Sequence, residues 1–301
     1  MSDEHSRRAL GCYGNEQIAT PNLDHLAEGG TRFPNAYCTD PICVPSRASI
    51  ATGRYPHKIE TWDNGRPYTG ATAQSWGHRL TDHGADVVTI GKLHYADSAD
   101  PTGFPDQRVP LHVHNKVGNP TGLLRASRPP TTGGRDFILQ AGPGETEYFR
   151  YDVDIADRAV RWLAHEALQS EQWALHVSFV SPHFPLVVPQ RYFGRYADVD
   201  VELPVQRSDA DWPRHPALDF HRRSQGNDVL STTKRSAPRP APTTASSRSS
   251  TSRWAASSTP RNGPDSSTTR WSFTRPTTGR CSARTGCGKR ARCTRSPSVC
   301  R

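Results

Sequence analysis

Residues 43–54 read Cys-Val-Pro-Ser-Arg-Ala-Ser-Ile-Ala-Thr-Gly-Arg, and this run guides the interpretation of the whole chain. A proline fits the first turn of a helix and a glycine often follows the last turn. The run therefore predicts a helix that begins near Cys43 and ends at Gly53. Unpaired N–H groups at a helix start favour negative charge, and Arg47 adds a positive charge one turn further on. A lone cysteine is usually a small buried hydrophobe, but these neighbours favour a reactive position for Cys43.

The pattern Cys-x-Pro-Ser-Arg-x-x-Ile-x-Thr-Gly-Arg resembles the signature of the sulfatase family. In that family a formylglycine-generating enzyme converts the cysteine to formylglycine, whose hydrated aldehyde is the nucleophile. The resemblance implies formylglycine at Cys43, with Arg47 and a metal ion holding the hydrated form. It also implies an α/β fold, an alkaline-phosphatase-like sandwich with a large mixed sheet between helices.

Two acids, Asp3 and Glu4, stand almost at the start of the sequence. Acids so close to a terminus are most often solvated, but sulfatases end their first strand with an acidic pair that binds a divalent cation, usually Ca²⁺. Carboxylates suit such a hard cation, so the resemblance implies a metal site formed by Asp3, Glu4 and the modified Cys43. The aliphatic strand expected before Asp3 is missing. This predicts a start codon placed too late or a core that lacks its first strand.

Residues 86–90 read Asp-Val-Val-Thr-Ile, which predicts a buried strand, and Gly-Lys-Leu-His follows at 91–94. Ligand sites in open α/β sheets lie at the carboxyl ends of strands, and side chains two apart in extended chain project from one face. Taken alone, Lys92 and His94 are more often an exposed lysine and a hydrogen-bonded histidine. Sulfatases carry Lys-x-His at such a strand end, which implies that Lys92 binds sulfate oxygens and that His94 accepts a proton.

A second strand is predicted at residues 173–180, and it runs into Ser-Pro-His-Phe-Pro at 181–185. A histidine between prolines at a strand end resembles the Pro-His-x-Pro motif of sulfatases. The resemblance implies that His183 contacts the sulfate and the leaving group.

The remaining segments up to residue 230 predict helices and one irregular insertion. Residues 97–145 are rich in proline, glycine and polar residues, which predicts an insertion of the kind that shapes substrate pockets. His112 and His114 within it are predicted to be surface residues. Helices are predicted from a capping Thr20 to Gly29, at 74–83 and at 151–168.

The composition changes after Leu230. Residues 231–301 hold 15 Lys and Arg against a single acid, Asp265, whereas residues 1–230 hold 23 basic and 28 acidic residues. Four of the seven cysteines, but only one aliphatic residue larger than alanine, fall in this tail. Because it cannot bury enough apolar surface, it is predicted to be disordered. The sequence thus predicts a catalytic domain at 1–230, the N-terminal part of a sulfatase, followed by a basic tail.

The tail also lacks the second metal pair and the further lysine that a sulfatase carries at this point. A shift in reading frame near Ser231 would explain this, since the codons for residues 275–279 can encode Ser-Asp-His-Gly in another frame. The tail is therefore predicted to be a frameshifted translation. The competing interpretation is a genuine basic tail that binds nucleic acid; otherwise neither nucleic acid nor a membrane is expected as a partner.

These observations favour a sulfuric ester hydrolase, similar to arylsulfatases or choline-sulfatases, that acts on a small-molecule sulfate ester with Ca²⁺ or another divalent cation. One alternative is a phosphonate monoester or phosphodiester hydrolase of the same superfamily. A second is a catalytically dead fragment, because the chain lacks half of its metal site. No apolar run reaches the length of a membrane span and no signal peptide precedes residue 1, which predicts a cytoplasmic location.

Overall fold

The computed structural model describes residues 1–118, 137–200, 215–216 and 218–220. All of them lie in the first of the two units into which the chain divides, Met1–Thr259. The tail at 231–301, with its predicted disorder and frameshift, lies outside the described residues. No helix in the described part combines the length and apolar character needed to cross a membrane.

The main sheet has β1 (Asp86–Lys92) at its centre, with β2 (Asp106–Leu111) on one side and β4 (Trp173–Ser178) on the other. Both pairings are parallel, with Ile90 opposite Arg108 and Val177. A separate parallel pair joins β3 (Gly142–Pro143) to β5 (Val187–Val188). The α/β class is confirmed, and the strands that the structure describes are all parallel.

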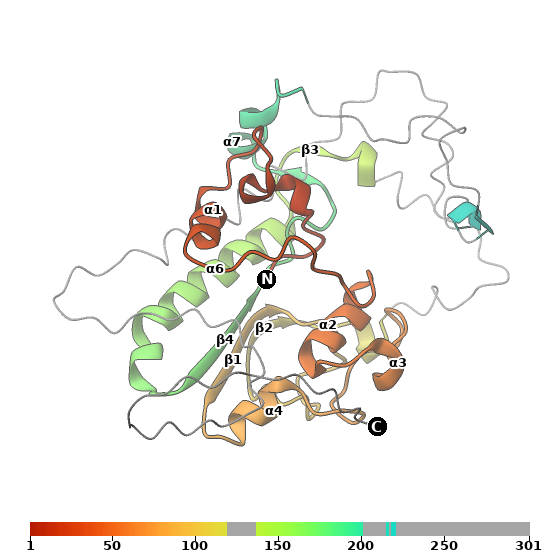
Figure 1. Cartoon of the computed structure of the whole chain (residues 1–301), viewed down its shortest axis with the longest axis vertical. Coiled ribbons are helices and arrows are strands. Elements are labelled where there is room, and N and C mark those ends of the chain that lie inside the picture. The colour runs from red at the N-terminus through yellow and green to blue at the C-terminus, as the bar shows by residue number, and fades with distance from the viewer. Residues whose placement is uncertain (119–136, 201–214, 217, 221–301) are drawn as a thin grey trace, which may run out of the picture. The chain divides into compact units, whose positions relative to one another are not determined.

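Helices cover both faces of the main sheet, as Figure 1 shows. Val88 and Ile90 of β1 pack against Ile155 of the long helix α6, whereas Val87 and Leu93 belong to the core under α2, α3 and α4. Alternate residues of a strand point to opposite faces, so β1 contributes to both cores. The α-helices whose bounds lie within the described residues are α1 (Pro21–Glu28), α2 (Cys43–Thr52), α3 (Pro56–Ile59), α4 (Trp76–Thr81), α6 (Glu147–His165) and α7 (Gln190–Phe193). Short 3₁₀ turns occupy Arg7–Ala9, Gly11–Tyr13, His114–Lys116, Ala167–Gln169 and Gly194–Tyr196.

The first residues of the chain extend the sheet beyond β4. The amino group of Met1 donates to the carbonyl of Val177 at 2.7 Å, and the N–H of Phe179 donates to the carbonyl of Met1 at 2.9 Å. The N–H of Asp3 then donates to the carbonyl of Ser181 at 3.3 Å. Since β1 occupies one edge of β4, this segment lies along the other edge, which brings Asp3 to the carboxyl end of the sheet.

The prediction of an irregular insertion at 97–145 is wrong in part, because the two-residue strand β3 and the longer strand β2 lie within it. The sequence of β2, Asp-Gln-Arg-Val-Pro-Leu, lacks the apolar alternation of a strand, and all six residues are half buried. Proline is tolerated in strands that carry a neighbour on one side only. His112 is also half buried rather than exposed, with its Nε2 2.9 Å from the hydroxyl of Ser98. His114 is exposed, as predicted.

The predicted helices are present with different ends. α1 follows Thr20, but the Thr20 hydroxyl does not cap it: the hydroxyl accepts the N–H of Gly11 at 2.9 Å and donates to Asp24 at 3.0 Å. α4 is shorter than predicted, and α6 begins four residues earlier than predicted because Thr146 caps it through the N–H of Phe149.

Candidate active site

Helix α2 begins at Cys43 and ends at Gly53, as its sequence predicts. Ile42 precedes the helix in an extended conformation and has no side chain that could cap it. Asn64 takes over this role from another loop, because its Oδ1 accepts the N–H of Val44 at 3.0 Å. Gly53 takes the left-handed conformation, with φ of 66°. Helix α2, which carries Cys43 at its start, is thus held by a cap at its beginning and by Gly53 at its end.

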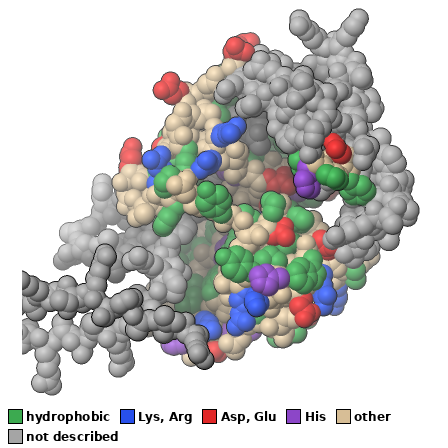
Figure 2. All heavy atoms as spheres, turned by 45° about the vertical axis from the view of Figure 1, so that its right-hand side comes forward, with side chains coloured by type: hydrophobic (Ala, Val, Ile, Leu, Met, Phe, Trp, Pro, Cys, Tyr) green, Lys and Arg blue, Asp and Glu red, His purple; other side chains and the backbone are tan. Residues whose placement is uncertain are grey.

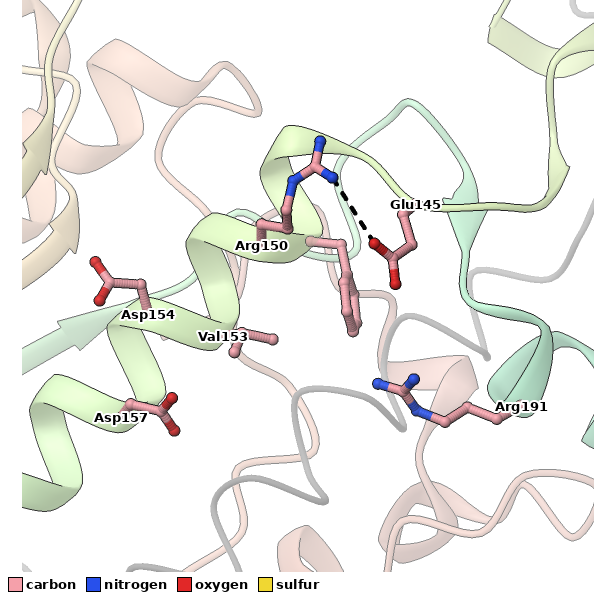
Figure 3. A pocket seen from close by; sticks show the side chains of 7 residues that line it. Glu145, Arg150, Val153, Asp154, Asp157 and Arg191 are labelled. Atoms are coloured by element: carbon pink, nitrogen blue, oxygen red, sulfur yellow. Dashed lines mark ion pairs between the residues drawn. The ribbon is translucent and has the colours of Figure 1, made fainter.

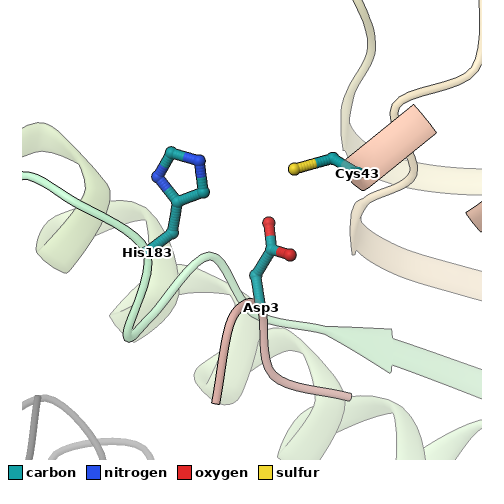
Figure 4. Close-up of side chains that lie close together, drawn as sticks. All are labelled: Asp3, Cys43 and His183. Carbon is teal, nitrogen blue, oxygen red and sulfur yellow. The ribbon is translucent and has the colours of Figure 1, made fainter. Parts of the chain in front are cut away.

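Three of the predicted site residues converge above the carboxyl end of the sheet. A carboxylate oxygen of Asp3, the sulfur of Cys43 and a ring nitrogen of His183 all lie within 4.8 Å of one another. Figure 4 shows these side chains pointing toward one another from the N-terminal segment, the start of α2 and the loop after β4. Asp3 is buried, while Cys43 and His183 are half buried and so accessible from solvent.

Two buried cations lie beneath this group. Lys92, the last residue of β1, donates its ammonium to the carboxylate of Asp3. Arg47 donates through Nη1 to the carbonyl of Lys92 and to the hydroxyl of Ser178 at 2.9 Å. Its Nη2 lies 3.6 Å from Asp3, and neither Nη2 nor Nε has a hydrogen-bond acceptor among the described residues. The site therefore offers unused N–H donors of the kind that bind anionic oxygens.

The charges of the site act on its titratable groups in opposite directions. Burial raises the pKa of Asp3, but the nearby Arg47 and Lys92 charges outweigh this, and the pKa lies below its ordinary value. Burial raises the pKa of the Cys43 thiol, and the Asp3 and Glu4 carboxylates add to this effect against the opposing charge of Lys92. An unmodified Cys43 is consequently a protonated thiol at neutral pH, although it stands at a helix start.

His94 enters the site by a different route from the one expected. Its φ of 57° breaks the strand, so Lys92 and His94 do not alternate along extended chain. The N–H groups of Leu93 and His94 both donate to the carbonyl of Leu111 in β2, which holds this turn. Burial, followed by the charges of Lys92 and Arg47, lowers the pKa of His94 to about 3. Its Nδ1 is buried and has no hydrogen-bond partner among the described residues. The low pKa means that the ring is neutral at physiological pH.

Glu4 lies beside the convergent group rather than within it. Its φ is 58°, its side chain is 49% exposed, and its carboxylate lies 3.8 Å from Nε2 of His183. For a divalent cation, Asp3 and Glu4 are suitable oxygen donors. The sulfur of Cys43 stands where the oxygens of a hydrated aldehyde would be, and oxygens suit Ca²⁺ far better than a thiol does. Asp3, Glu4 and a hydrated aldehyde at position 43 thus supply oxygen donors that fit a hard cation.

Two contributors to this geometry are absent from the sequence predictions. Ser178 orients Arg47 from β4, and Asn64 caps α2. In the sequence, Ser178 is an ordinary residue of a predicted strand and Asn64 an ordinary loop residue, with no motif around either. Their contacts are long-range, across 131 and 20 positions of sequence. No local pattern reveals them.

A separate surface hollow of about 340 Å³ shares no residue with this site (Figure 3). Within it, Arg150 lies 3.8 Å from the carboxylate of Glu145, and the guanidinium of Arg191 lies over the ring of Phe149 at 5.8 Å. Because these cations are already engaged, the hollow offers no converging set of reactive groups. It is lined by Glu145, Phe149, Arg150, Val153, Asp154, Asp157 and Arg191.

Solved structures with the same fold include enzymes of two activities. The phosphonate monoester hydrolase of Agrobacterium radiobacter superposes with a TM-score of 0.59 at 22% identity, over 85% of this chain and 57% of that one. A putative sulfatase from Bacteroides fragilis gives a TM-score of 0.51 at 24% identity, over 85% and 56% of the two chains. At these identities the likeness concerns the fold, and it confirms the alkaline-phosphatase-like architecture.

Relatives by sequence are sulfatases. The uncharacterized sulfatase YidJ of Escherichia coli (strain K12) is 30% identical over 72% of this chain and 45% of its own length. The arylsulfatase of Clostridium perfringens (strain 13 / Type A) is 28% identical over 70% of this chain and 47% of its own. This chain thus spans less than half the length of these relatives. The Sulfatase family model matches residues 1–233, and together with the converging Asp3, Cys43 and His183 this match shows that the chain belongs to the sulfatase family.

Proposed function

We propose that residues 1–230 are the N-terminal part of the catalytic domain of a sulfuric ester hydrolase that uses formylglycine made from Cys43 and a divalent cation such as Ca²⁺. The observation that carries this proposal is the convergence of Asp3, Cys43 and His183 within 4.8 Å, above the buried cations of Lys92 and Arg47. Three separate segments supply anion-binding and metal-binding groups to one accessible point.

The modification and the cation would supply what the chain lacks. Formylglycine provides, as its hydrate, a hydroxyl nucleophile and a second hydroxyl that can lose a proton; the cation lowers the pKa of that hydrate and neutralises charge. Because the pKa of the Cys43 thiol is raised, an unmodified cysteine would be a poor nucleophile here. This supports a formylglycine-generating enzyme as a partner of the chain.

The remaining roles fall to residues already at the site. Asp3, with Glu4 beside it, would bind the cation. Lys92 and His183 would bind the oxygens of the ester, and the buried position of Lys92 strengthens its attraction for charge that develops as the S–O bond breaks.

Two further residues would act on the hydrated aldehyde. Arg47 would hold it through its unused N–H groups. His94 is uncharged at physiological pH because its pKa is lowered to about 3, and in this proposal its neutral ring is the group that accepts the proton of the hydrated aldehyde. Its unpartnered Nδ1 is the atom available for this.

For the substrate we propose a small sulfate ester. The relatives include the arylsulfatase of Clostridium perfringens and a choline-sulfatase of Rhizobium meliloti, which is 27% identical over 61% of this chain. The alternative is a phosphonate monoester, an activity named for one of the enzymes that share the fold. On the face in Figure 2, Lys and Arg side chains are interspersed with Asp and Glu side chains.

The experiment compares hydrolysis of an aryl sulfate with that of a phenyl phosphonate by the 301-residue chain, produced together with a formylglycine-generating enzyme. Mass spectrometry of the peptide that carries residue 43 measures conversion, and Cys43→Ala is the control. We expect the aryl sulfate to be hydrolysed by the converted protein and not by Cys43→Ala. Preferential phosphonate cleavage would favour the alternative, and a fully converted chain with Ca²⁺ that cleaves neither ester would leave a catalytically dead fragment.

The variant His94→Gln tests the proton acceptor. General base catalysis contributes roughly 10²–10⁴-fold, so kcat for the aryl sulfate is expected to fall by about that factor while the fold is kept. His114→Gln, at an exposed position, is the matched control and should leave kcat unchanged. Equal kcat values for the two variants would remove His94 from the mechanism.

A further inference from the structure

Asp152, in the second turn of α6, is a buried carboxylate that forms none of the ion pairs found in the described part of the chain. It is 8% exposed. Its Oδ1 accepts the N–H of Val180 at 2.7 Å, and its Oδ2 accepts the N–H of Ser181 at 2.8 Å. Both carboxylate oxygens are therefore committed to two consecutive residues just beyond the end of β4.

The same two residues hold the site on their other side. The carbonyl of Val180 accepts the N–H of His183 at 3.0 Å, and the carbonyl of Ser181 accepts the N–H of Asp3 at 3.3 Å. The carboxylate of Asp152 is thus connected, through the backbone of Val180 and Ser181, to the backbone N–H groups of His183 and Asp3. Charge-assisted hydrogen bonds are shorter and stronger than neutral ones. The two bonds to the Asp152 carboxylate are therefore the strongest of these four contacts.

Packing of the helix alone does not require a carboxylate at this point. Ile155 and Ala156, one turn along α6, are 0% and 5% exposed and already attach the helix to β1 and its neighbours. Burying a carboxylate is costly unless hydrogen bonds compensate it. Asp152 therefore has a different purpose from its apolar neighbours, namely to fix the loop from Val180 to His183.

We propose that Asp152 is a positioning residue that holds Asp3 and His183 in the arrangement that binds the cation and the ester. The inference rests on the proposed function, because it takes Asp3 and His183 to be the residues that face these groups. Asp152 touches neither of them and acts only through the backbone of Val180 and Ser181. Loss of such outer contacts typically weakens metal binding about 10–100-fold.

The test measures the Kd for Ca²⁺ by calorimetry on the 301-residue chain, without substrate. Asp152→Asn keeps the shape of the side chain but replaces one acceptor oxygen by a donor that faces an N–H group. We expect its Kd to rise about 10–100-fold. The matched control is Asp154→Asn on the same helix, whose carboxylate forms a 2.8 Å pair with Arg158 at the surface. Its Kd should remain that of the unaltered chain.

A second measurement on the unaltered chain remains decisive if Asp152→Asn fails to fold. Site-resolved amide exchange with and without Ca²⁺ should show slower exchange of the N–H groups of Asp3, Val180, Ser181 and His183 when Ca²⁺ is present. The N–H groups at the far end of α6 should not change. Equal exchange rates at these four positions with and without Ca²⁺ would overturn the inference.

Two calorimetric results would also overturn it: the same Kd for folded Asp152→Asn and Asp154→Asn, or no Ca²⁺ binding by the unaltered chain. The outcome is separable from that of the proposed function. A converted chain that binds Ca²⁺, loses this affinity in Asp152→Asn and cleaves no ester would refute the ester hydrolase while leaving the positioning role of Asp152 in place.

Discussion

Lys92 and Asp3 lie 89 positions apart in sequence, and the ammonium of one donates directly to the carboxylate of the other in the interior of the protein. Their side chains are 2% and 9% exposed. Two buried charges of opposite sign stabilise the fold only as long as both are present, because either one alone would be left in a medium of low dielectric constant. The contact ties the N-terminal segment to the end of β1.

Lys92→Met should therefore destabilise the protein as well as impair ester binding. Removing one partner of a buried pair costs about 3–5 kcal/mol, and the nearby Arg47 should place the loss at the lower end of that range. Urea denaturation measures the free energy of unfolding. Arg66→Met is the control, because Arg66 pairs with Glu60 at the surface, where a pair contributes less than about 1 kcal/mol. Equal losses in the two variants would show that the buried pair is not special.

Gly91→Ala should disrupt the strand that leads into the site. Gly91 has φ of 100°, and an added Cβ would lie 2.2 Å from the carbonyl oxygen of Ser178 and 2.7 Å from Cδ1 of Ile155. We expect a loss of at least about 1–3 kcal/mol, measured by thermal unfolding. Gly14→Ala separates the two causes, because Gly14 has φ of 94° but no atom near its added Cβ. A similar loss at both positions would attribute the effect to backbone conformation alone.

Asn64→Ala should remove the cap of α2. The N–H of Val44 would lose its acceptor, and such a loss costs about 1 kcal/mol. Asn64→Asp retains the acceptor oxygen and adds a charge that the helix start favours, so its free energy of unfolding should match or exceed that of the unaltered chain. If Asn64→Ala unfolds at the same urea concentration as Asn64→Asp, the cap does not contribute to stability.

The stability of the protein should fall in mild acid because of His176. This residue lies in β4 with its ring 6.2 Å from that of Trp76, and burial, followed by the N-terminal amine and Arg47, lowers its pKa to about 3. Below pH 6.5 the unfolded chain binds a proton at this position while the folded chain does not, so stability is lost as the pH falls from 6.5 toward 3. At pH 5 the loss amounts to about 2 kcal/mol.

The variant His176→Gln removes this titration. The difference between its free energies of unfolding at pH 7 and pH 5 should be about 2 kcal/mol smaller than in the unaltered chain. His114→Gln, at the exposed position, should leave that difference as it is. An unchanged pH dependence in His176→Gln would show that other groups cause the acid sensitivity.

The elements of the fold that were predictable are those with local signals. Helix α2 is marked by its proline and by Gly53, and β1 by the β-branched residues of Val-Val-Thr-Ile at 87–90, and both are confirmed. β2 was missed because polar side chains and Pro110 interrupt any strand pattern, and only its pairing with β1 makes it a strand. Pairing between strands is a tertiary contact that propensity does not contain.

The candidate site divides in the same way. Asp3, Cys43 and His183 were named from motifs and do converge. The spacing of Lys92 and His94 was interpreted as extended chain, whereas His94 has a left-handed backbone that ends the extended run. The sign of φ at a histidine is set by contacts with β2, which no local pattern contains. Asp152 reads as one polar residue of an amphipathic helix, and only the tertiary structure gives it a partner.

The pairing of Met1 with Val177 has a consequence for the order of events during synthesis. The two residues are 176 positions apart, and a ribosome adds about 5–20 residues per second. After their own synthesis, the residues at Met1–Asp3 therefore wait roughly ten seconds or longer for the strand they pair with. Until then Asp3 has no sheet to join, and chaperones or premature contacts have access to the edge that it will occupy. Completion of this centre is a late event, timed by the emergence of β4.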